Sequence, residues 1–378
     1  MDVQFSEEQV LLRESARDFL EKECPPARVR ELMDEPRGSS DDFWKKLADL
    51  GWLGLTLPEE HGGAGLDLLD LAIVLEEMGR ALVPDPFLST LALGARAIEL
   101  AGSAEQQARY LPAVAQGRLR IALAFLEEEP SWSPEALRLA DGAGADGFRL
   151  EGDKSFVSDA ASADLLLVPV RSEAGVSCLL VETSAAGVEI APVAYNDMTR
   201  KVSRVCFSGT ALPADALLGE PGRAWPWLQR VLDFAKVALC AEMLGGAQRA
   251  MEMSVAYAKQ REQFGRPIGS FQAIQHKCAN QLVKVEGMRS ATWYAAWSVA
   301  GGEPDAHTSA CLAKAYCSEA YSAVAGDAIQ IHGGLGFTWE QDPHLFYKRA
   351  KADELLFGSP SANRELAARE IIDGRGAG

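Results

Sequence analysis

Residues 257–277 read YAKQREQFGRPIGSFQAIQHK, and this stretch organises the rest of the chain. Met251, Val255 and Ala258 keep helical spacing, which predicts a helix with one apolar and one charged face. The segment Phe264-Gly265-Arg266-Pro267 is expected to end that helix, because glycine permits a left-handed turn and proline cannot donate to the preceding turn. The stretch therefore predicts a helix, a turn and a second helix.

Arg261 is expected at the C-terminal end of the first helix, beside the glycine turn. Its planar and permanently charged guanidinium offers a fork of donors that suits a phosphate or pyrophosphate. The second helix is expected to open at Ser270, whose hydroxyl can cap it. The same pattern also describes a surface helix that ends in an ordinary turn. The stretch alone leaves both interpretations open.

Two blocks of the sequence resemble the acyl-CoA dehydrogenase family. The first is an Arg-x-x-Phe-Gly-x-Pro-Ile turn followed by Phe-Gln, formed here by Arg261, Phe264, Gly265, Pro267, Ile268, Phe271 and Gln272. The second is QIHGGLGF at residues 330–337. The resemblance covers nearly the whole chain. It implies an FAD-dependent enzyme that oxidises acyl-CoA thioesters to 2-enoyl thioesters, as in β-oxidation and related lipid metabolism.

Composition limits the other possibilities. The chain of 378 residues has room for two or three domains. Its net charge of −17 argues against nucleic acid or an anionic membrane as the main partner. Its seven cysteines show no C-x-x-C spacing, so neither a disulfide framework nor a metal site is signalled. The polar N-terminus and short apolar runs predict no leader and no membrane span, and we expect a cytoplasmic protein.

The pattern predicts an α+β protein of three domains. Residues 1–118 are expected to be all helical, and residues 222–378 to form a helical bundle of the four-helix type. Between them, residues 119–221 read as short strands in an antiparallel barrel or sheet, with candidates at 121–125, 148–157, 165–170, 176–181, 188–195 and 202–207. This order of helical, β and helical domains is also the architecture that the resemblance implies.

The resemblance assigns cofactor contacts to both family blocks. Arg261 would bind the pyrophosphate, while Gln330 and the backbone at Gly333 and Gly334 would let a flat group approach closely. In the family these blocks reach across a dimer interface into the neighbour's flavin, which implies at least a dimer, and a dimer of dimers is expected. The other residues carried over as cofactor contacts are Phe264, Phe271, Gln272 and Ser359. An alternative interpretation of the glycines is a tight helix-packing turn, and His332 is expected to be packed rather than catalytic.

The middle domain departs from the family pattern. Members usually carry a Thr-Glu-Pro-Gly-Ala-Gly-Ser-Asp loop whose donors touch the flavin ring. Residues 126–133 read LEEEPSWS instead, so the glycines are missing and three carboxylates stand near an expected anionic cofactor. Further on, Phe156 and Ser158 can still cover a ring face and offer a hydroxyl to the flavin. Binding of FAD by this chain alone is therefore in doubt, and the cofactor is expected to be shared with a partner subunit.

The usual catalytic base is missing. The reaction needs a carboxylate on one face of the thioester α-carbon. Members place that Glu where Phe357 stands here, or, in a minority, where Ala235 stands. Nearby substitutes are Glu354 and Asp233, although most such carboxylates are simply solvated or paired. Asp233 and Lys236 are carried over as substrate contacts, with Lys236 keeping a positive charge suited to CoA.

The resulting hypothesis is a subunit of an FAD-dependent acyl-CoA dehydrogenase that pairs with an intact sister chain. In the family, bacterial heteromeric enzymes that act on steroid side chains are the nearest model. One alternative is a catalytically silent homo-oligomer that binds acyl groups or flavin. Another is a flavin oxidase-like enzyme, similar to nitroalkane oxidases, with a relocated carboxylate. The sequence does not distinguish linear, branched and steroid acyl groups.

Overall fold

The computed structural model describes residues 5–144 and 147–373, and it separates into two compact units. The first unit contains residues 1–30, 68–83 and 236–378. The second contains residues 31–67 and 84–235. Each unit combines segments that are distant in the sequence, and helix α7 (Trp225–Gln260) passes from the second unit into the first at Lys236.

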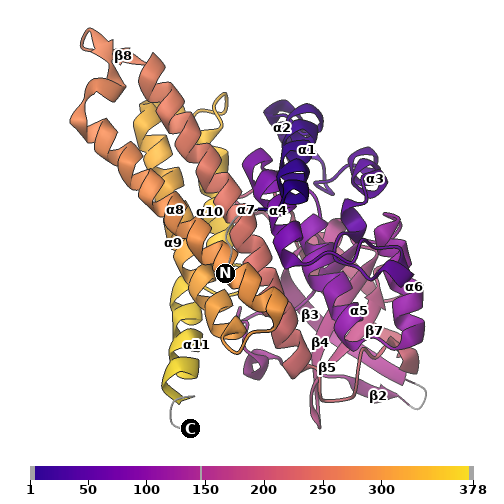
Figure 1. Cartoon of the computed structure of the whole chain (residues 1–378). Coiled ribbons are helices and arrows are strands. Elements are labelled where there is room, and N and C mark those ends of the chain that lie inside the picture. The colour runs from indigo at the N-terminus through magenta and orange to yellow at the C-terminus, as the bar shows by residue number, and fades with distance from the viewer. Residues whose placement is uncertain (1–4, 145–146, 374–378) are drawn as a thin grey trace. The chain divides into compact units, whose positions relative to one another are not determined.

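The first unit is helical. Its longest helices are α7, α8 (Gln272–Gly301) and α9 (Ala306–His332), drawn in orange tones in Figure 1. Helix α9 packs against α8, α10 and α11. The remaining helices of this unit are α1 (Glu7–Glu23), most of α2 (Pro26–Asp34), α4 (Leu68–Ala81), α10 (Pro343–Leu355) and α11 (Pro360–Asp373). No helix in the described part of the chain is both long and apolar enough to cross a membrane.

Helices α4 and α7 touch through their backbones. A Cβ atom added at Gly245 of α7 would lie 1.7 Å from the carbonyl oxygen of Glu76, and one at Gly79 of α4 would lie 1.9 Å from that of Glu242. Only glycine permits this approach. The Glu242 side chain forms a buried ion pair with Arg349 of α10, so the crossing is also tied to the bundle by charge.

The helical part of the second unit is built from short elements. They are α3 (Asp41–Asp49), α5 (Arg96–Ala101), α6 (Ala104–Ala115) and the single turns η1 (Trp52–Gly54) and η2 (Glu59–His61). The segment η3 (Ser89–Ala95), expected to be an ordinary helix, is a buried π-helix. Ser40 and Ser103 accept backbone N–H groups at the starts of α3 and α6, as capping residues do.

The β part of the second unit has two sheets. One has the order β1-β4-β5 and the other the order β2-β3-β7-β6. The strands are β1 (Ile121–Leu123), β2 (Gly142–Gly144), β3 (Gly147–Ser158), β4 (Leu165–Ser172), β5 (Gly175–Glu182), β6 (Val188–Pro192) and β7 (Val202–Pro213). All six expected strands are present. Of the two expected forms, barrel or sheet, the sheet form is confirmed, because in the described residues the two sheets do not close into a barrel. The pairing differs from the expectation at one point, since β1 runs parallel to β4 rather than antiparallel.

One apolar core joins the two sheets. Leu166 and Val168 of β4 pack in the same buried cluster as Leu150 of β3 and Val205 and Phe207 of β7. The alternating burial along β7 accounts for this, since every second side chain of a strand points to the same face. The two sheets therefore form a layered sandwich-like unit rather than a barrel.

The stretch at 257–277 folds largely as predicted. Helix α7 ends at Gln260, and Phe264 and Gly265 both adopt positive φ between the two-residue strands β8 (Glu262–Gln263) and β9 (Arg266–Pro267). Ser270 does not cap the second helix. Its hydroxyl donates to the carbonyl of Pro267, inside the turn η7 (Ile268–Ser270), and α8 begins at Gln272 without a side-chain cap.

We predict that Gly245→Ala destabilises the helical unit, because its new methyl group would overlap the Glu76 carbonyl. Overpacking of this kind costs about 1–3 kcal/mol and occasionally more. Thermal melting of the variant checks the expectation. The matched control is Gly326→Ala in α9, where a Cβ would meet only Tyr347 at 3.6 Å. The control should gain roughly 0.5–1 kcal/mol of helix stability, and equal melting temperatures for the two variants would contradict the assignment.

Candidate functional site

Helix α7, which precedes the first family block, meets the second block at one end of the bundle. The ring of Tyr257, near the end of α7, stacks on His332, at the end of α9, with centroids 4.3 Å apart. His332 is buried, and its Nδ1 lies 2.7 Å from the carbonyl oxygen of Ala328. Burial lowers the pKa of His332. This histidine joins the two helices, as expected of a packed rather than catalytic residue.

The turn after α7 presents its side chains to solvent. Phe264 is 92% exposed and contacts Phe271 edge-on, with ring centroids 6.1 Å apart. The guanidinium of Arg266 lies over the Phe271 ring at 4.2 Å. Arg261 and Gln272 are also exposed. A projecting aromatic group beside an exposed arginine suits a contact with another molecule rather than with this chain's own core.

The end of α9 leaves open space in front of its glycines. Gly333 has φ +63°, and a Cβ at Gly333 or Gly334 would meet no atom of the described chain within 4 Å. Gly336 differs, because its Cβ would lie 2.7 Å from the Ile329 carbonyl oxygen. The helix-packing interpretation therefore holds for Gly336 alone. Gln330 is exposed next to the open glycines.

The second unit holds the other proposed flavin-side residues, at the end of β3. The register between β3 and β7 shifts between Lys154 and Val157, and Phe156 has φ +50° at this irregularity. Bulges of this kind redirect side chains. Phe156 is accordingly 44% exposed, whereas Ser158 is half-buried. Asp159 follows with φ +60° and accepts the hydroxyl of Ser89 at 2.7 Å.

The carboxylate run at 127–129 is not a uniform negative patch. Glu127 points inward, and its carboxylate lies 2.8 Å from the Nζ atom of Lys154. Lys154 is completely buried. Glu128 and Glu129 are exposed. Of the three carboxylates expected to disfavour an anionic cofactor, Glu127 is therefore compensated by Lys154, whereas Glu128 and Glu129 face solvent.

The turn around Phe357, where the sequence resemblance predicts the family's catalytic position, is enclosed by the bundle. Phe357 is only 2% exposed and has φ +58°, a conformation that an L-residue other than Asn or Asp rarely adopts. Gly358 follows with φ +99°. The segment between α10 and α11 is thus a strained turn, and such strain persists only where the surroundings fix it.

Two buried side chains fix this turn. The amide nitrogen of Asn363 donates to the carbonyls of Phe357, Gly358 and Ser359, the last a proposed cofactor contact, at 2.9–3.2 Å. The Nζ of Lys314 donates to the carbonyls of Glu354 and Gly358 at 3.3 and 3.2 Å. The turn is therefore held through its backbone carbonyls, independently of the side chain at position 357.

Glu354, the first candidate for a relocated base, is paired. Its carboxylate accepts the hydroxyl of Ser322 at 2.8 Å and forms an ion pair with Lys351. Burial by itself would raise the pKa of Glu354, but these two partners outweigh it and hold the pKa below the ordinary value. A carboxylate with a lowered pKa is a weaker proton acceptor, which weighs against this role.

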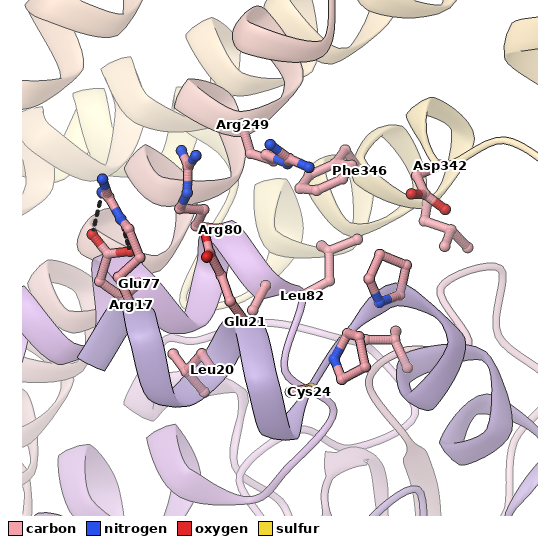
Figure 2. A pocket seen from close by; sticks show the side chains of 15 residues that line it. Arg17, Leu20, Glu21, Cys24, Glu77, Arg80, Leu82, Arg249, Asp342 and Phe346 are labelled. Atoms are coloured by element: carbon pink, nitrogen blue, oxygen red, sulfur yellow. Dashed lines mark hydrogen bonds and ion pairs between the residues drawn. The ribbon is translucent and has the colours of Figure 1, made fainter. Parts of the chain in front are cut away.

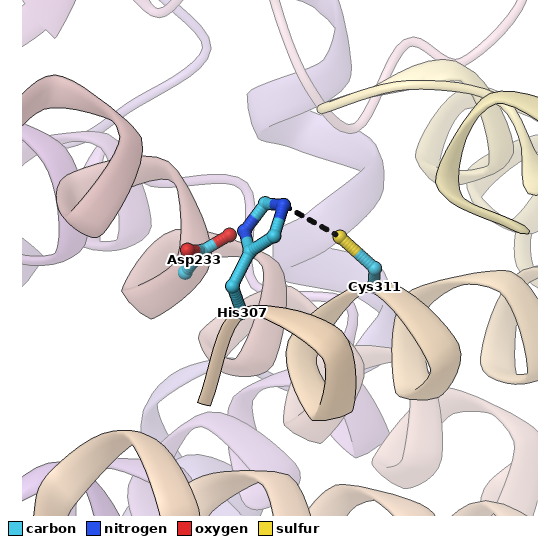
Figure 3. A group of neighbouring side chains, drawn as sticks. All are labelled: Asp233, His307 and Cys311. Atoms are coloured by element: carbon cyan, nitrogen blue, oxygen red, sulfur yellow. Dashed lines mark hydrogen bonds between the residues drawn. The ribbon is translucent and has the colours of Figure 1, made fainter. Parts of the chain in front are cut away.

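The residues proposed near the substrate all lie on α7. Asp233, Ala235 and Lys236 are buried. The Nζ of Lys236 lies 3.2 Å from the Sγ atom of Cys311 on α9. Figure 3 shows Cys311 beside His307, one helical turn earlier, with Sγ 3.8 Å from Nε2. Lys236 thus faces the inside of the bundle in this conformation.

A cavity of about 180 Å³ lies elsewhere in the first unit, among α1, α4, α7 and α10. Figure 2 shows its charged lining, in which Arg17 forms a two-pronged ion pair with Glu77 at 2.7 and 3.0 Å. Arg80 pairs with Glu252. Because these charges compensate one another, the cavity does not attract an anion strongly. No motif in the sequence pointed to it.

Comparison with known proteins identifies the family. The chain matches the N-terminal domain model of acyl-CoA dehydrogenases over residues 6–118 and the C-terminal domain model over residues 222–372. It is 35% identical to the acyl-CoA dehydrogenase IpdE2 of Mycolicibacterium smegmatis over 97% of this chain and 100% of that protein. The chain belongs to the acyl-CoA dehydrogenase family.

Two solved structures support the same assignment. A variant of the Tcur3481-Tcur3483 steroid acyl-CoA dehydrogenase aligns with a TM-score of 0.89 and 32% identity over 98% of this chain and 99% of that one. The ChsE4-ChsE5 complex from Mycobacterium tuberculosis aligns with a TM-score of 0.90 and 28% identity over the same shares. The α+β fold with helical N- and C-terminal regions is thereby confirmed, and members of the family are FAD-dependent oxidoreductases.

The chain fits FAD only in part. The exposed Arg261 and the open space at Gly333 and Gly334 suit a pyrophosphate and a flat group that approaches from outside. The loop at 126–133 does not suit the ring, because Glu127 turns inward to Lys154. Sequence reasoning missed Lys154, Lys314 and Asn363. The strand and the helix that contain these lysines carry other charged residues as well, so no signal in the sequence set the two lysines apart.

We predict that Lys314→Met weakens the turn at Phe357 in a pH-dependent way. Burial lowers the pKa of Lys314 to about 8, against an ordinary value of 10.5. Between these values the unfolded chain holds the proton that the folded chain has lost, so this group's contribution to stability rises with pH. The gap in melting temperature between parent and variant should widen from pH 7.5 to 9.5. The exposed Lys259→Met is the control, and parallel curves for Lys314→Met and the parent would contradict the prediction.

Proposed function

We propose that this chain is a subunit of a heteromeric FAD-dependent acyl-CoA dehydrogenase, and that it supports a partner's catalytic site without supplying the base. The observation that carries the proposal is Phe357. It is buried at the position that the resemblance assigns to the catalytic Glu, in a turn that Lys314 and Asn363 hold in shape. A phenyl ring cannot take a proton from the thioester α-carbon.

The residues at the exposed end of the bundle would contact the FAD bound in the partner subunit. Arg261 would compensate the pyrophosphate charge with charge-assisted hydrogen bonds. Gln330 would add a neutral donor, and the open glycine backbone would admit a flat group. FAD, when bound, accepts the hydride from the β-carbon of the thioester. The role of this chain's residues is to bind and orient, which lowers the barrier by positioning alone.

The relatives support the choice of partner and substrate class. One is described as the ChsE4-ChsE5 complex, and another as the Tcur3481-Tcur3483 steroid acyl-CoA dehydrogenase. Each name joins two chains. We infer that this chain joins a second family member with an intact catalytic Glu, in a dimer of dimers, and that bulky ring-derived acyl groups are the first substrates to test. The paired state of Glu354 weighs against the alternative of a relocated base.

We predict that Arg261→Ala lowers the flavin content of the assembled oligomer. Loss of one charge-assisted partner of the pyrophosphate costs roughly 1.5–3 kcal/mol, or about 10- to 100-fold in FAD affinity. The measurement is the flavin-to-protein absorbance ratio after dialysis. Lys259→Ala, close by in sequence and also exposed, is the charge-matched control. An unchanged ratio for Arg261→Ala would remove this residue from the cofactor site.

We also predict that the lone chain carries little FAD and does not turn over any acyl-CoA. Absence of a general base alone costs about 10²- to 10⁴-fold in rate. The test is an electron-acceptor assay with short, long and steroid acyl-CoA thioesters, first on the lone chain and then with an intact sister subunit added. Activity should appear only in the mixture. Phe357→Glu alone should not restore it, because a buried carboxylate needs neighbours that set its pKa for proton abstraction, and a site built around a phenyl ring is not arranged to supply them.

Three results would redirect this proposal. Turnover by the lone chain that survives Phe357→Ala and is lost with Glu354→Gln would assign the base to Glu354. Stoichiometric FAD in a homo-oligomer without turnover would favour the silent acyl- or flavin-binding protein. A yellow, self-sufficient dehydrogenase would refute the subunit role.

A further inference from the structure

The carboxylate of Glu127 is held by several hydrogen-bond donors of its own chain, as a bound anion would be. Its two oxygens accept the backbone N–H groups of Arg138 and Leu139 at 2.8 and 3.1 Å and the ammonium of Lys154 at 2.8 Å. These three donors come from separate segments: the turn after η4 (Pro134–Ala136) supplies two and the middle of β3 supplies the third. Converging backbone and cationic donors of this kind are the usual components of an anion site.

The charge of Lys154 requires this partner. Its side chain is fully buried, and its only other acceptor among the contacts described is the Phe125 carbonyl at 3.3 Å. Burial lowers the pKa of Lys154 and on its own would raise the pKa of Glu127, but the lysine and the two N–H groups hold the Glu127 pKa below its ordinary value. The two groups lie 2.8 Å apart as an ion pair, and removal of one member would leave the other buried without this compensation.

The rest of the loop is also turned toward its own chain. The Leu126 carbonyl accepts the Ser155 N–H at 2.7 Å. The hydroxyl of Ser133 donates to Glu135. The Trp132 ring stacks on Phe125, just after β1, with centroids 5.2 Å apart and an interplanar angle of 21°. Hydroxyl, carbonyl and aromatic groups that could face a planar cofactor thus have internal partners.

We propose that Glu127 is an internal ligand that occupies an anion-binding nest in the middle domain. Together with Trp132 it blocks the surface on which this chain's own middle domain would otherwise contact the flavin ring. The consequence rests on the proposed function: the subunit that holds the flavin must be a different chain, whose corresponding loop carries free N–H and hydroxyl donors. A second copy of this chain would bring the same loop, blocked in the same way.

Chemical rescue tests the nest. Glu127→Ala removes a fragment the size of acetate, so acetate can replace it. The variant should melt about 5 °C or more below the parent. Acetate at about 0.1 M should recover at least half of that loss in a saturable way, since a ligand that binds only the folded state stabilises it. Chloride at the same ionic strength should not.

The controls separate the nest from a general salt effect. Glu128→Ala removes an exposed carboxylate from the same run and should show no response to acetate. Glu127→Leu combined with Lys154→Met replaces the pair by apolar groups, so it should fold without acetate and should not respond to it, even if the single variant proves insoluble. No acetate response in a folded Glu127→Ala, or an equal response in either control, would overturn the assignment.

Equilibrium dialysis with FAD tests whether Glu127 and Trp132 block the flavin, independently of any activity. Glu127→Ala combined with Trp132→Ala should bind FAD at least about tenfold more tightly than the parent chain, because donors and space are released. Acetate should compete with that binding. Unchanged FAD affinity in a folded double variant would overturn the proposal that Glu127 and Trp132 block the flavin. The subunit role is tested separately, by the electron-acceptor assay with an added sister subunit.

Discussion

A buried ammonium must be surrounded by oxygen atoms, and this requirement shapes both halves of the chain. In the second unit Lys154 draws Glu127 inward and thereby sets the course of the loop that follows β1. In the first unit Lys314 draws the carbonyls of Glu354 and Gly358 together and sets the turn around Phe357. Both lysines lie in otherwise apolar surroundings, where an uncompensated charge would be strongly destabilising. Each therefore acts as a fixed point around which irregular backbone is arranged.

The same requirement explains the state of the two regions that a family member uses for catalysis. The turn at Phe357 retains its backbone because Lys314 and Asn363 hold carbonyl groups, which do not depend on the side chain at that position. The course of the loop after β1, by contrast, depends on a side chain, because Glu127 turns inward to Lys154. The exposed end of the bundle, at Arg261 and Gly333, depends on neither lysine.

Sequence patterns predicted the elements well and the irregular segments poorly. Strong periodicity placed the six main strands and the helix that ends before Glu262, because burial of one face dictates those periods. The parallel pairing of β1 with β4 was not foreseen, since it depends on contacts distant in sequence. Ser270 was misread as a cap because it lies in the turn η7 and α8 begins only at Gln272. The inward turn of Glu127 could not be foreseen, because its partner lies 27 residues further along the chain.

The positive φ of Phe357 bears on what a substitution at this position would cost. A bulky residue in the left-handed region is less stable than glycine or asparagine there, by an amount on the order of 1 kcal/mol. The ring of Phe357 is nevertheless 2% exposed, so it fills the interior space beneath the turn. A single change to a carboxylate would at once open a void and bury a charge, so this buried ring is hard to replace by an acidic group.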